Sequence, residues 1–214
     1  MLTVGFMHIG KISKVAQIMV ASVRKAMPTA RVVQMTDADT KPVIGVDDVI
    51  RKRYDGKYPM PYRLLHLKDF PDADAVFLDT DVVVQKDLAP VFENEFDIGL
   101  TIRDQPVFDP EGIDITITMP YNTGVMFSRA SGRAFWEAAY RHCLTFSDFE
   151  KEWWGDQLSV KAVADTTTLN LKTFPCSLYN YTPDRSDEDL SERFVVHYKG
   201  LRKEWMLRLS RAGG

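Results

Sequence analysis

The stretch from Ala75 to Val84 reads A-V-F-L-D-T-D-V-V-V and places two carboxylates inside an otherwise apolar run. A run this hydrophobic is typical of a strand that is buried on both faces. A buried carboxylate is costly unless a positive charge or hydrogen bonds compensate it. Three valines follow the second acid, where a solvated turn would carry polar residues. We therefore expect a strand that delivers Asp79 and Asp81 to a divalent cation.

Side chains on an extended strand alternate between its faces, so Asp79 and Asp81 are predicted to point the same way, with Thr80 between them. Two carboxylates on one face suit a hard metal such as Mn²⁺ or Mg²⁺, and such an ion in turn binds phosphate oxygens. The alternative is that both acids begin a solvated turn, in which Asp is common.

The length of 214 residues suits one domain with a substantial core, so we predict a single domain over residues 1–214. A net charge of -3 is no signature of general nucleic-acid binding, and a phosphate-bearing substrate would need a local cation. We find no signal peptide and no apolar stretch of membrane-spanning length. Cys143 and Cys176 form no Cys-x-x-Cys pair, so we expect reduced, buried thiols in a cytoplasmic protein.

The N-terminal part of the chain alternates strand and helix patterns. Residues 2–7 read as a strand, a helix runs from a Ser13 N-cap to Pro28, and residues 31–35 read as a second strand. This order predicts a parallel pair with a right-handed crossover, and hence an α/β fold. Further along, we predict a loop over 38–60, a helix between Pro61 and Pro71, strands over 98–102, 113–118, 121–127, 168–173 and 194–198, a helix over 131–144, a helix opening near 152–158, and a charged loop over 183–193.

Polar residues follow several of these strands. Ligands of open α/β sheets gather at the carboxyl ends of the strands. The prediction places Thr36-Asp37, Asp79-Thr80-Asp81 and His197 at such ends.

Four separated motifs converge on one type of chemistry. In chain order they are Asp79-Thr80-Asp81, Asn122-Thr123-Gly124, Gly155-Asp156-Gln157 and His197-Tyr198-Lys199-Gly200-Leu201-Arg202-Lys203. Their order and spacing resemble the nucleotide-diphosphosugar transferases of the GT-A fold, specifically the retaining enzymes of glycosyltransferase family 8, the glycogenin and galactosyltransferase type. The resemblance runs from the first strand to Lys203. It implies a Rossmann-like mixed sheet flanked by helices.

The resemblance also implies roles for individual residues. Asp79, Asp81 and His197 would hold Mn²⁺ or Mg²⁺, and two hard oxygens with one imidazole suit such an ion. Asn122 and Asp156 would hold sugar hydroxyls, and Gln157 would lie beneath the anomeric carbon. The remaining donor-binding residues would be Arg63, Thr80, Gly124, Gly200, Lys203 and, near the base, Asp37.

An amide at position 157 is a poor nucleophile, so the resemblance implies front-face transfer with retention. The departing phosphate would take the acceptor's proton while Lys203 absorbs charge. The implied donor is UDP-glucose or UDP-galactose. The acceptor stays open among a glycan, a lipopolysaccharide, a protein hydroxyl and a modified nucleic-acid base.

Each of these residues also has a purely structural interpretation. His197 could be a core histidine, Arg63 an exposed helix arginine, Asn122 a turn residue and Asp156 a helix N-cap. Trp153 and Trp154 replace an acid that glycogenin-like enzymes carry before Gly-Asp-Gln. Such aromatic residues could stack on an acceptor sugar or a base, or fill the core, and we expect one of the two to fill the core. The acidic loop at 183–189 is either a lid over bound donor or a solvated connector.

Two other functions compete with transfer. One is a nucleotide-sugar or glycan-binding module without turnover. The other is a haloacid-dehalogenase-type phosphatase, which also has a strand ending in Asp-x-Asp, but the segment after Gly155 lacks the second acid of that site.

Overall fold

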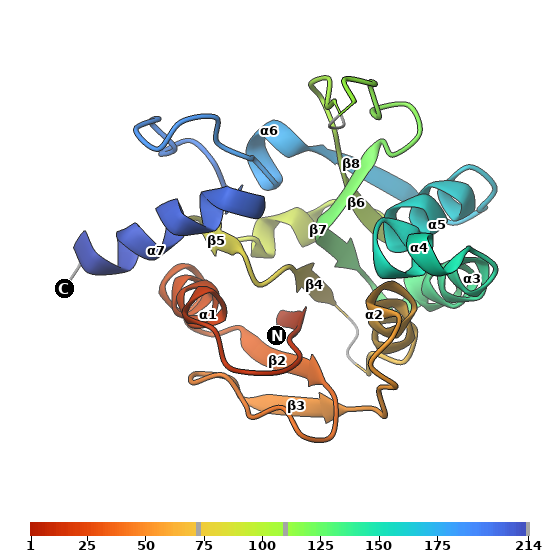
Figure 1. The fold of residues 1–214 in the computed structure, drawn as a ribbon, viewed down its shortest axis with the longest axis horizontal. Helices are drawn as coiled ribbons and strands as arrows, with labels where there is room; N and C mark the ends of the chain where they lie inside the picture. Colours follow the sequence, from red (N-terminus) through yellow and green to blue (C-terminus); the bar gives the residue numbers. More distant parts are fainter. Residues whose placement is uncertain (72–73, 109–110, 213–214) are drawn as a thin grey trace.

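A mixed β-sheet forms the centre of the computed structural model, which describes residues 1–71, 74–108 and 111–212. The sheet has the strand order β3-β2-β1-β4-β7-β6-β8 (Figure 1). Only β7 is antiparallel to its neighbours in this sheet. The strands are β1 (Thr3–Met7), β2 (Arg31–Thr36), β3 (Asp48–Arg51), β4 (Ala75–Leu78), β6 (Ile98–Ile102), β7 (Tyr121–Ser128) and β8 (Leu171–Pro175).

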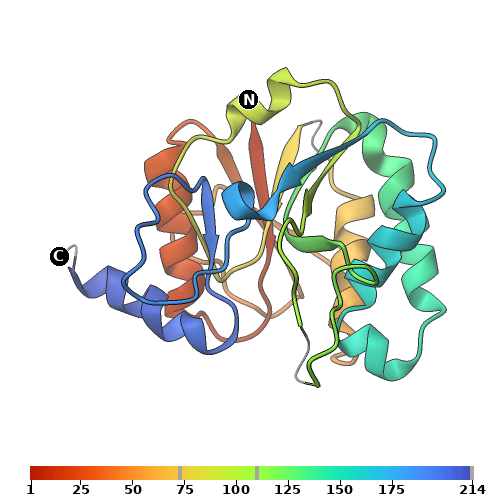
Figure 2. The same cartoon turned by 90° about the horizontal axis from the view of Figure 1, so that it is seen from above.

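Helices cover both faces of the sheet (Figures 1 and 2). One face carries α1 (Lys14–Ala26) and α7 (Lys203–Ala212), and the other carries α2 (Pro59–Lys68), α3 (Arg133–Leu144), α4 (Asp148–Glu152) and α5 (Gly155–Ala164). None of the helices in the described part of the chain is long and apolar enough to cross a membrane. Short helical segments complete the chain: η1 (Ala89–Glu93), η2 (Ala130–Gly132), α6 (Cys176–Tyr179) and η3 (Gly200–Arg202).

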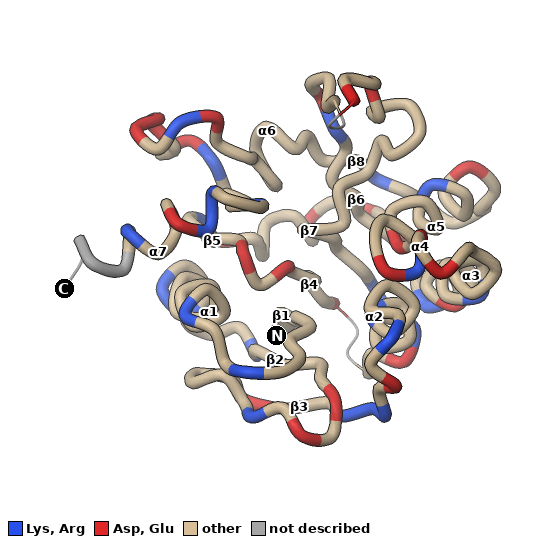
Figure 3. Tube along the Cα trace, in the orientation of Figure 1, with Lys and Arg blue, Asp and Glu red and all other residues tan. Residues whose placement is uncertain are grey.

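The apolar stretch 75–84 divides between two sheets. β4 is fully buried, as its sequence predicts, but the chain then leaves the main sheet. The strand β5 (Val82–Val84) pairs instead with β9 (Val195–His197) in a separate antiparallel pair. The acidic positions between β4 and β5 therefore lie at the junction of the two sheets, near the middle of the molecule (Figure 3). The expectation of one continuous strand is wrong, because residues 79–81 separate the two strands and Thr80 and Asp81 form a turn. The alternative of a turn at the acids is correct in this respect, although Asp79 and Asp81 are partly buried.

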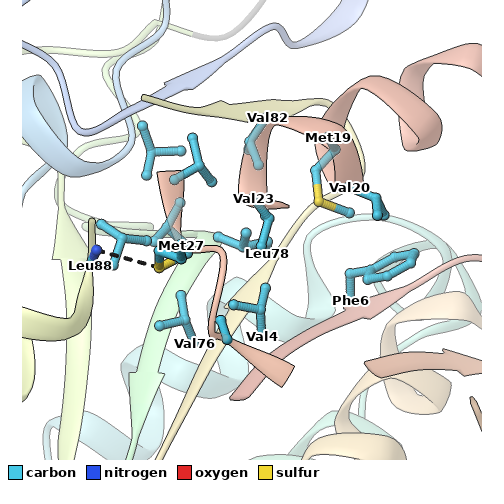
Figure 4. Close-up of a cluster of buried hydrophobic side chains, with 14 of the residues drawn as sticks. Val4, Phe6, Met19, Val20, Val23, Met27, Val76, Leu78, Val82 and Leu88 are labelled. Atoms are coloured by element: carbon cyan, nitrogen blue, oxygen red, sulfur yellow. Dashed lines mark hydrogen bonds between the residues drawn. The ribbon is translucent and has the colours of Figure 1, made fainter. Parts of the chain in front are cut away.

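Helix α1 shows how the sequence builds one face of the core. Ser13 caps the helix, since its Oγ accepts a hydrogen bond from the Ala16 amide at 3.1 Å. Met19, Val20 and Val23 recur at helical spacing and pack against the sheet residues shown in Figure 4. Burial of each such side chain contributes about 1.5–3 kcal/mol. This packing fixes β1 and β4, and with them the start of the acidic segment.

Most predicted elements are confirmed, including the β-α-β unit, the loop at 183–193 and the helices at 131–144 and after Gly155. Two predictions are wrong. The loop expected over 38–60 contains β3, a short, half-buried edge strand parallel to β2. Residues 113–118 form turns instead of a strand, with one isolated bridge at Asp114. There, the Thr116 hydroxyl accepts from the Val107 amide and the Asp114 carboxylate accepts from the Thr116 amide, and such local bonds compete with a sheet ladder. The last strand of the main sheet runs over 171–175 instead of 168–173.

Candidate active site

Asp79, Asp81 and His197 meet at the junction of the two sheets. One ligand atom from each lies within 4.8 Å of the others. His197 Nε2 is 3.1 Å from Asp81 Oδ1 and 3.6 Å from Asp79 Oδ2. Neighbouring ligands around an octahedral ion with bonds of about 2.1 Å are about 3 Å apart. The spacing of the three groups therefore fits a divalent ion of the Mg²⁺ or Mn²⁺ kind.

The protonation of His197 supports the same interpretation. Its Nδ1 lies 2.8 Å from Asn180 Oδ1. The Asn180 amide nitrogen donates to Thr101 Oγ1 and to the Asn122 carbonyl, so the Asn180 oxygen must be the acceptor for His197. In the neutral imidazole, Nδ1 then carries the proton and Nε2 presents its lone pair to the two carboxylates. Three electron-rich groups thus face one point, an arrangement that a cation stabilises.

Gly124 makes room for the histidine. A Cβ atom built on Gly124 would lie 2.3 Å from His197 Cε1 and 2.5 Å from its Nδ1. The ring is buried, and its two nitrogens contact Asn180 and Asp81. Only glycine at position 124 therefore allows the imidazole to take this position.

A buried arginine joins two of the motifs. Arg63 on α2 lies 2.9 Å from Asp79 Oδ1 through Nη2 and 2.9 Å from Asp156 Oδ2 through Nη1. It also donates to the Thr123 carbonyl at 2.6 Å. Asp156 sits at the N-terminus of α5, where its other oxygen accepts from the Gln157 amide. Arg63 is thus a buried bridge between carboxylates, and the interpretation of Arg63 as an exposed helix arginine is wrong.

The charged groups of this network shift one another's pKa values. Burial would lower the pKa of Arg63, but Asp79 and Asp156 raise it above its usual value. Burial raises the pKa of Asp79 in spite of the neighbouring Arg63 and His197. Burial also acts to raise the pKa of Asp81, but its contact with His197 and the charge of Lys203 bring it below its ordinary value. Of Asp79 and Asp81, the second therefore stays ionised to the lower pH.

The C-terminal motif adds a cation beside the carboxylates. Lys203 Nζ lies 3.1 Å from Asp81 Oδ2. Three residues earlier, Gly200 has a φ of 59°, a left-handed conformation that favours glycine. This turn brings the start of α7 back over the junction. Thr80 and Lys203 both line the cleft that lies above the acids.

The cleft above the acids has a volume of about 310 Å³. Asp79, Asp81, Asp156, Gln157 and Lys203 line it, and Trp153 and Trp154 lie along its edge. The two tryptophans are 60% and 41% exposed, so the expectation that one of them fills the core is wrong. Trp154 also has a φ of 36°, the only positive φ of a non-glycine residue among those the structure describes. Strained backbone of this kind tends to occur at functional sites.

Gln157 is held by a residue that the motifs do not include. Arg103, just after β6, donates through Nη2 to Gln157 Oε1 at 2.7 Å. The same guanidinium donates through Nη1 to the Tyr121 carbonyl at 2.8 Å and to the Met119 carbonyl. The amide of Gln157 is therefore oriented by a cation that is itself fixed to the backbone before β7.

Two predicted donor-binding residues lie away from the cleft. Asn122 lies within β7, so the turn interpretation is wrong; its side chain accepts from the Gly124 amide at 3.1 Å and lines a neighbouring cavity instead. Asp37 accepts from the Asp39 and Thr40 amides and lines two shallow pockets near the ends of β1, β2 and β3. The structure therefore brings ten of the twelve candidates to the junction or its immediate surroundings: Arg63, Asp79, Thr80, Asp81, Gly124, Asp156, Gln157, His197, Gly200 and Lys203.

Comparison with known proteins identifies the architecture. No protein-family model matches the sequence, and no curated protein matches it either. Among solved structures, a glycosyltransferase involved in the glycosylation of the major capsid of PBCV-1 superposes with a TM-score of 0.66 at 13% identity, covering 98% of both chains. The galactosyltransferase LgtC, in complex with donor and acceptor sugar analogs, gives 0.55 at 14% identity over 98% of this chain and 95% of its own. GlyE of Streptococcus pneumoniae TIGR4 gives 0.60 at 16% identity over 95% of this chain and 59% of its own.

The chain has the GT-A fold of glycosyltransferases. The predicted fold class and the resemblance to the GT-A fold are thereby confirmed. Within this GT-A architecture, two residues that the sequence motifs do not include, Asn180 and Arg103, also shape the site. Neither belongs to a motif, and each acts on a candidate residue far away in sequence: Asn180 on His197 and Arg103 on Gln157.

Proposed function

We propose that this GT-A protein is a metal-dependent, retaining glycosyltransferase that moves a hexose from a nucleotide diphosphosugar, UDP-glucose or UDP-galactose, to an acceptor hydroxyl. The observation that carries the proposal is the convergence of Asp79, Asp81 and His197 beneath a cleft that also holds Lys203, Asp156 and Gln157. The glycosyltransferases that share the fold support it.

The donor's diphosphate would lie over the junction. A Mn²⁺ or Mg²⁺ ion on Asp79, Asp81 and His197 would supply positive charge for the phosphate oxygens. Lys203 now pairs with Asp81, and its ammonium is half exposed toward the cleft, so it can turn from the carboxylate to the leaving diphosphate. It would stabilise negative charge as the bond to the sugar breaks.

The sugar would lie beside Asp156 and Gln157. Arg63 and Thr123 hold Asp156 through the same carboxylate oxygen, which fixes it in place as an acceptor for sugar hydroxyls. Gln157 has its oxygen bound by Arg103, so its NH₂ group is the part left to face the ring. A carboxamide held in this way forms no stable glycosyl intermediate, which supports transfer on one face with retention.

A thermal-shift panel tests the nucleotide and metal sites together. A ligand that binds only the folded state raises the melting temperature. We expect UDP and one UDP-hexose to raise it in the presence of Mn²⁺ and to have little effect with EDTA. Asp81→Asn should remove the Mn²⁺-dependent shift, whereas the exposed control Asp87→Asn should keep it. The absence of a shift for every nucleotide with Mn²⁺ would overturn the proposal.

Donor hydrolysis separates an enzyme from a binding module. Glycosyltransferase sites that bind donor and admit water release the free sugar and UDP slowly. We expect Mn²⁺-dependent release of UDP from the donor that gives the thermal shift, lost in Asp81→Asn. Tight donor binding with no release of UDP, in the presence or absence of candidate acceptors, would favour the non-catalytic module.

A further inference from the structure

A second cavity, of about 490 Å³, lies next to the proposed donor cleft. Its walls come from the loop that follows β6, from α6 and the residues after it, and from the segment between β9 and α7. Asn122 forms part of its lining, and Arg103 lies in its wall while holding Gln157 of the cleft. The two spaces are therefore neighbours separated by the contact between Arg103 and Gln157.

Three cations face this cavity: Arg103, Lys199 and Arg202. The Lys199 ammonium has no hydrogen bond or ion pair in the described part of the chain, although the side chain is largely covered. The Nε atom of Arg103 is buried and has no hydrogen-bond partner among those residues. A covered cation without a partner is costly, and so is a buried donor without one, so the Lys199 ammonium and the remaining N–H of Arg103 both favour an anion in this cavity.

The two acids that line the cavity, Asp104 and Asp184, are outnumbered by the three cations, and among the described residues neither forms an ion pair with Arg103 or Lys199. Asp104 is occupied by Ser177, whose amide donates to Oδ1 at 3.0 Å and whose hydroxyl donates to Oδ2. Asp184 lies at the rim with its side chain 85% exposed, 3.7 Å from Arg202. An ion pair this exposed, with its atoms this far apart, is weak. Arg202 can therefore release Asp184 and bind a ligand instead. The cavity therefore keeps an excess of positive charge although the whole chain is acidic.

We propose that this cavity binds the acceptor through an anionic group, a phosphate or a carboxylate. The inference rests on the proposed function, because it takes the cavity beside the transferred sugar as the place of the acceptor. Lys199 and Arg202 contact the anion with charge-assisted hydrogen bonds, and the acceptor hydroxyl points past Asn122 toward the cleft. An acceptor of this class is a sugar phosphate or an acidic sugar.

The test measures binding of four probes by calorimetry in EDTA, without nucleotide: inorganic phosphate, glucose 6-phosphate, glucuronate and glucose. We expect one anionic probe to bind and glucose not to bind. Loss of a charge-assisted hydrogen bond weakens binding by about tenfold or more. Lys199→Met and Arg202→Gln should each show this loss, while the exposed control Lys25→Met should bind as the wild type. The preferred probe identifies the group as phosphate or carboxylate.

Two further variants distinguish binding at the anion site from binding at the donor site. Lys203→Met should retain binding of the anionic probe, and Lys199→Met should retain the thermal shift with UDP and Mn²⁺. Equal binding of the probe by the wild type and Lys199→Met, or loss of binding only in Lys203→Met, would overturn the inference. If the wild type shows no shift with any nucleotide, the proposed function falls and the assignment of the cavity to an acceptor falls with it.

Discussion

Asn180 orients the candidate metal-binding histidine without touching the metal position itself. Its side-chain oxygen accepts from His197 Nδ1, and its nitrogen is fixed by Thr101 and Asn122. Residues that orient a metal ligand in this way commonly change metal affinity by about 10–100-fold. The histidine is therefore positioned by three residues that lie in β6, β7 and the segment after α6.

Replacement of Asn180 by Ala should weaken Mn²⁺ binding by about 10–100-fold, because the imidazole loses the bond that fixes its tautomer and direction. The affinity is measured by titration with Mn²⁺ and its electron paramagnetic resonance signal. Asn170→Ala is the matched control, since that side chain donates to the Glu95 carbonyl on the surface. Equal Mn²⁺ affinity in both variants would contradict the positioning role.

The Gly124→Ala substitution should displace the His197 ring, because a Cβ atom would lie 2.3 Å from it. We expect loss of the Mn²⁺-dependent thermal shift, with little change in the circular dichroism spectrum. The displaced ring can be followed directly by the NMR signals of its imidazole protons. Unchanged imidazole signals and unchanged Mn²⁺ binding would show that the site tolerates the methyl group.

At this scale, the sequence predicted the residues that approach the metal and the phosphates, because these carry rare side chains at motif spacing. It could not predict Asn180 or Arg103, whose bonds span 17 and 54 residues and follow only from the folded chain. It also left open an exposed helix position for Arg63, which is wrong because two carboxylates outside α2 bind its side chain. Partners brought together by topology leave no local pattern.

At the scale of elements, the start of α5 combines exposed aromatic residues with an unusual backbone. Trp154 is the N-cap residue of α5, with φ 36° and ψ -7°, and makes no side-chain cap hydrogen bond. The left-handed residue reverses the chain between α4 and α5. As a result, Asp156 in the first turn reaches Arg63 on α2. The helix dipole of α5 adds to the stabilisation of that carboxylate.

A pair of substitutions at position 154 tests this strain. Both Trp154→Gly and Trp154→Ala remove the indole, but only Ala keeps a Cβ atom in the left-handed region. We expect the Gly variant to have the higher free energy of unfolding, by about 1 kcal/mol. Urea denaturation of the two variants measures the difference. A more stable Ala variant would show that the loop relaxes and that the conformation carries no strain.

The element-scale errors have a common origin in the ambiguity of short apolar runs. The break between β4 and β5 falls at Asp79-Thr80-Asp81, but the apolar residues on both sides of it favoured a single strand, whereas β5 pairs with β9, far along the chain. β3 is four residues long and lies at a sheet edge, so its pattern resembles that of a loop. Long periodic elements such as α1 and α3 were predictable because one face of each packs on the sheet.

At the scale of the whole molecule, a buried histidine on α2 links stability to pH. His66 is almost fully covered, and neither ring nitrogen has a hydrogen-bond partner among the described residues. Burial lowers the pKa of His66 from 6.5 to about 4. The unfolded chain therefore binds the proton at a higher pH than the folded chain does. The contribution of His66 to stability is complete above pH 6.5 and is lost as the pH falls from 6.5 toward 4.

We expect the free energy of unfolding to fall by on the order of 3 kcal/mol across this range because of His66 alone. Urea denaturation at several pH values between 4 and 7.5 measures the slope. His66→Leu removes the titrating group and fills the same apolar space, so its stability should depend less on pH over this window. An identical slope in the variant and the wild type would assign the acid sensitivity to other groups.

The separation of β5 from the main sheet also sets the order in which the site can form during synthesis. His197 follows Asp81 by 116 residues, and β9 is the strand that secures β5. During synthesis, Asp79 and Asp81 therefore leave the ribosome long before His197 and Lys203 do. A nascent polypeptide that stops before β9 contains every strand of the main sheet but lacks a complete cation site. Capacity for metal-dependent chemistry would thus arise in one step, once β9 and the lysine after it have been made.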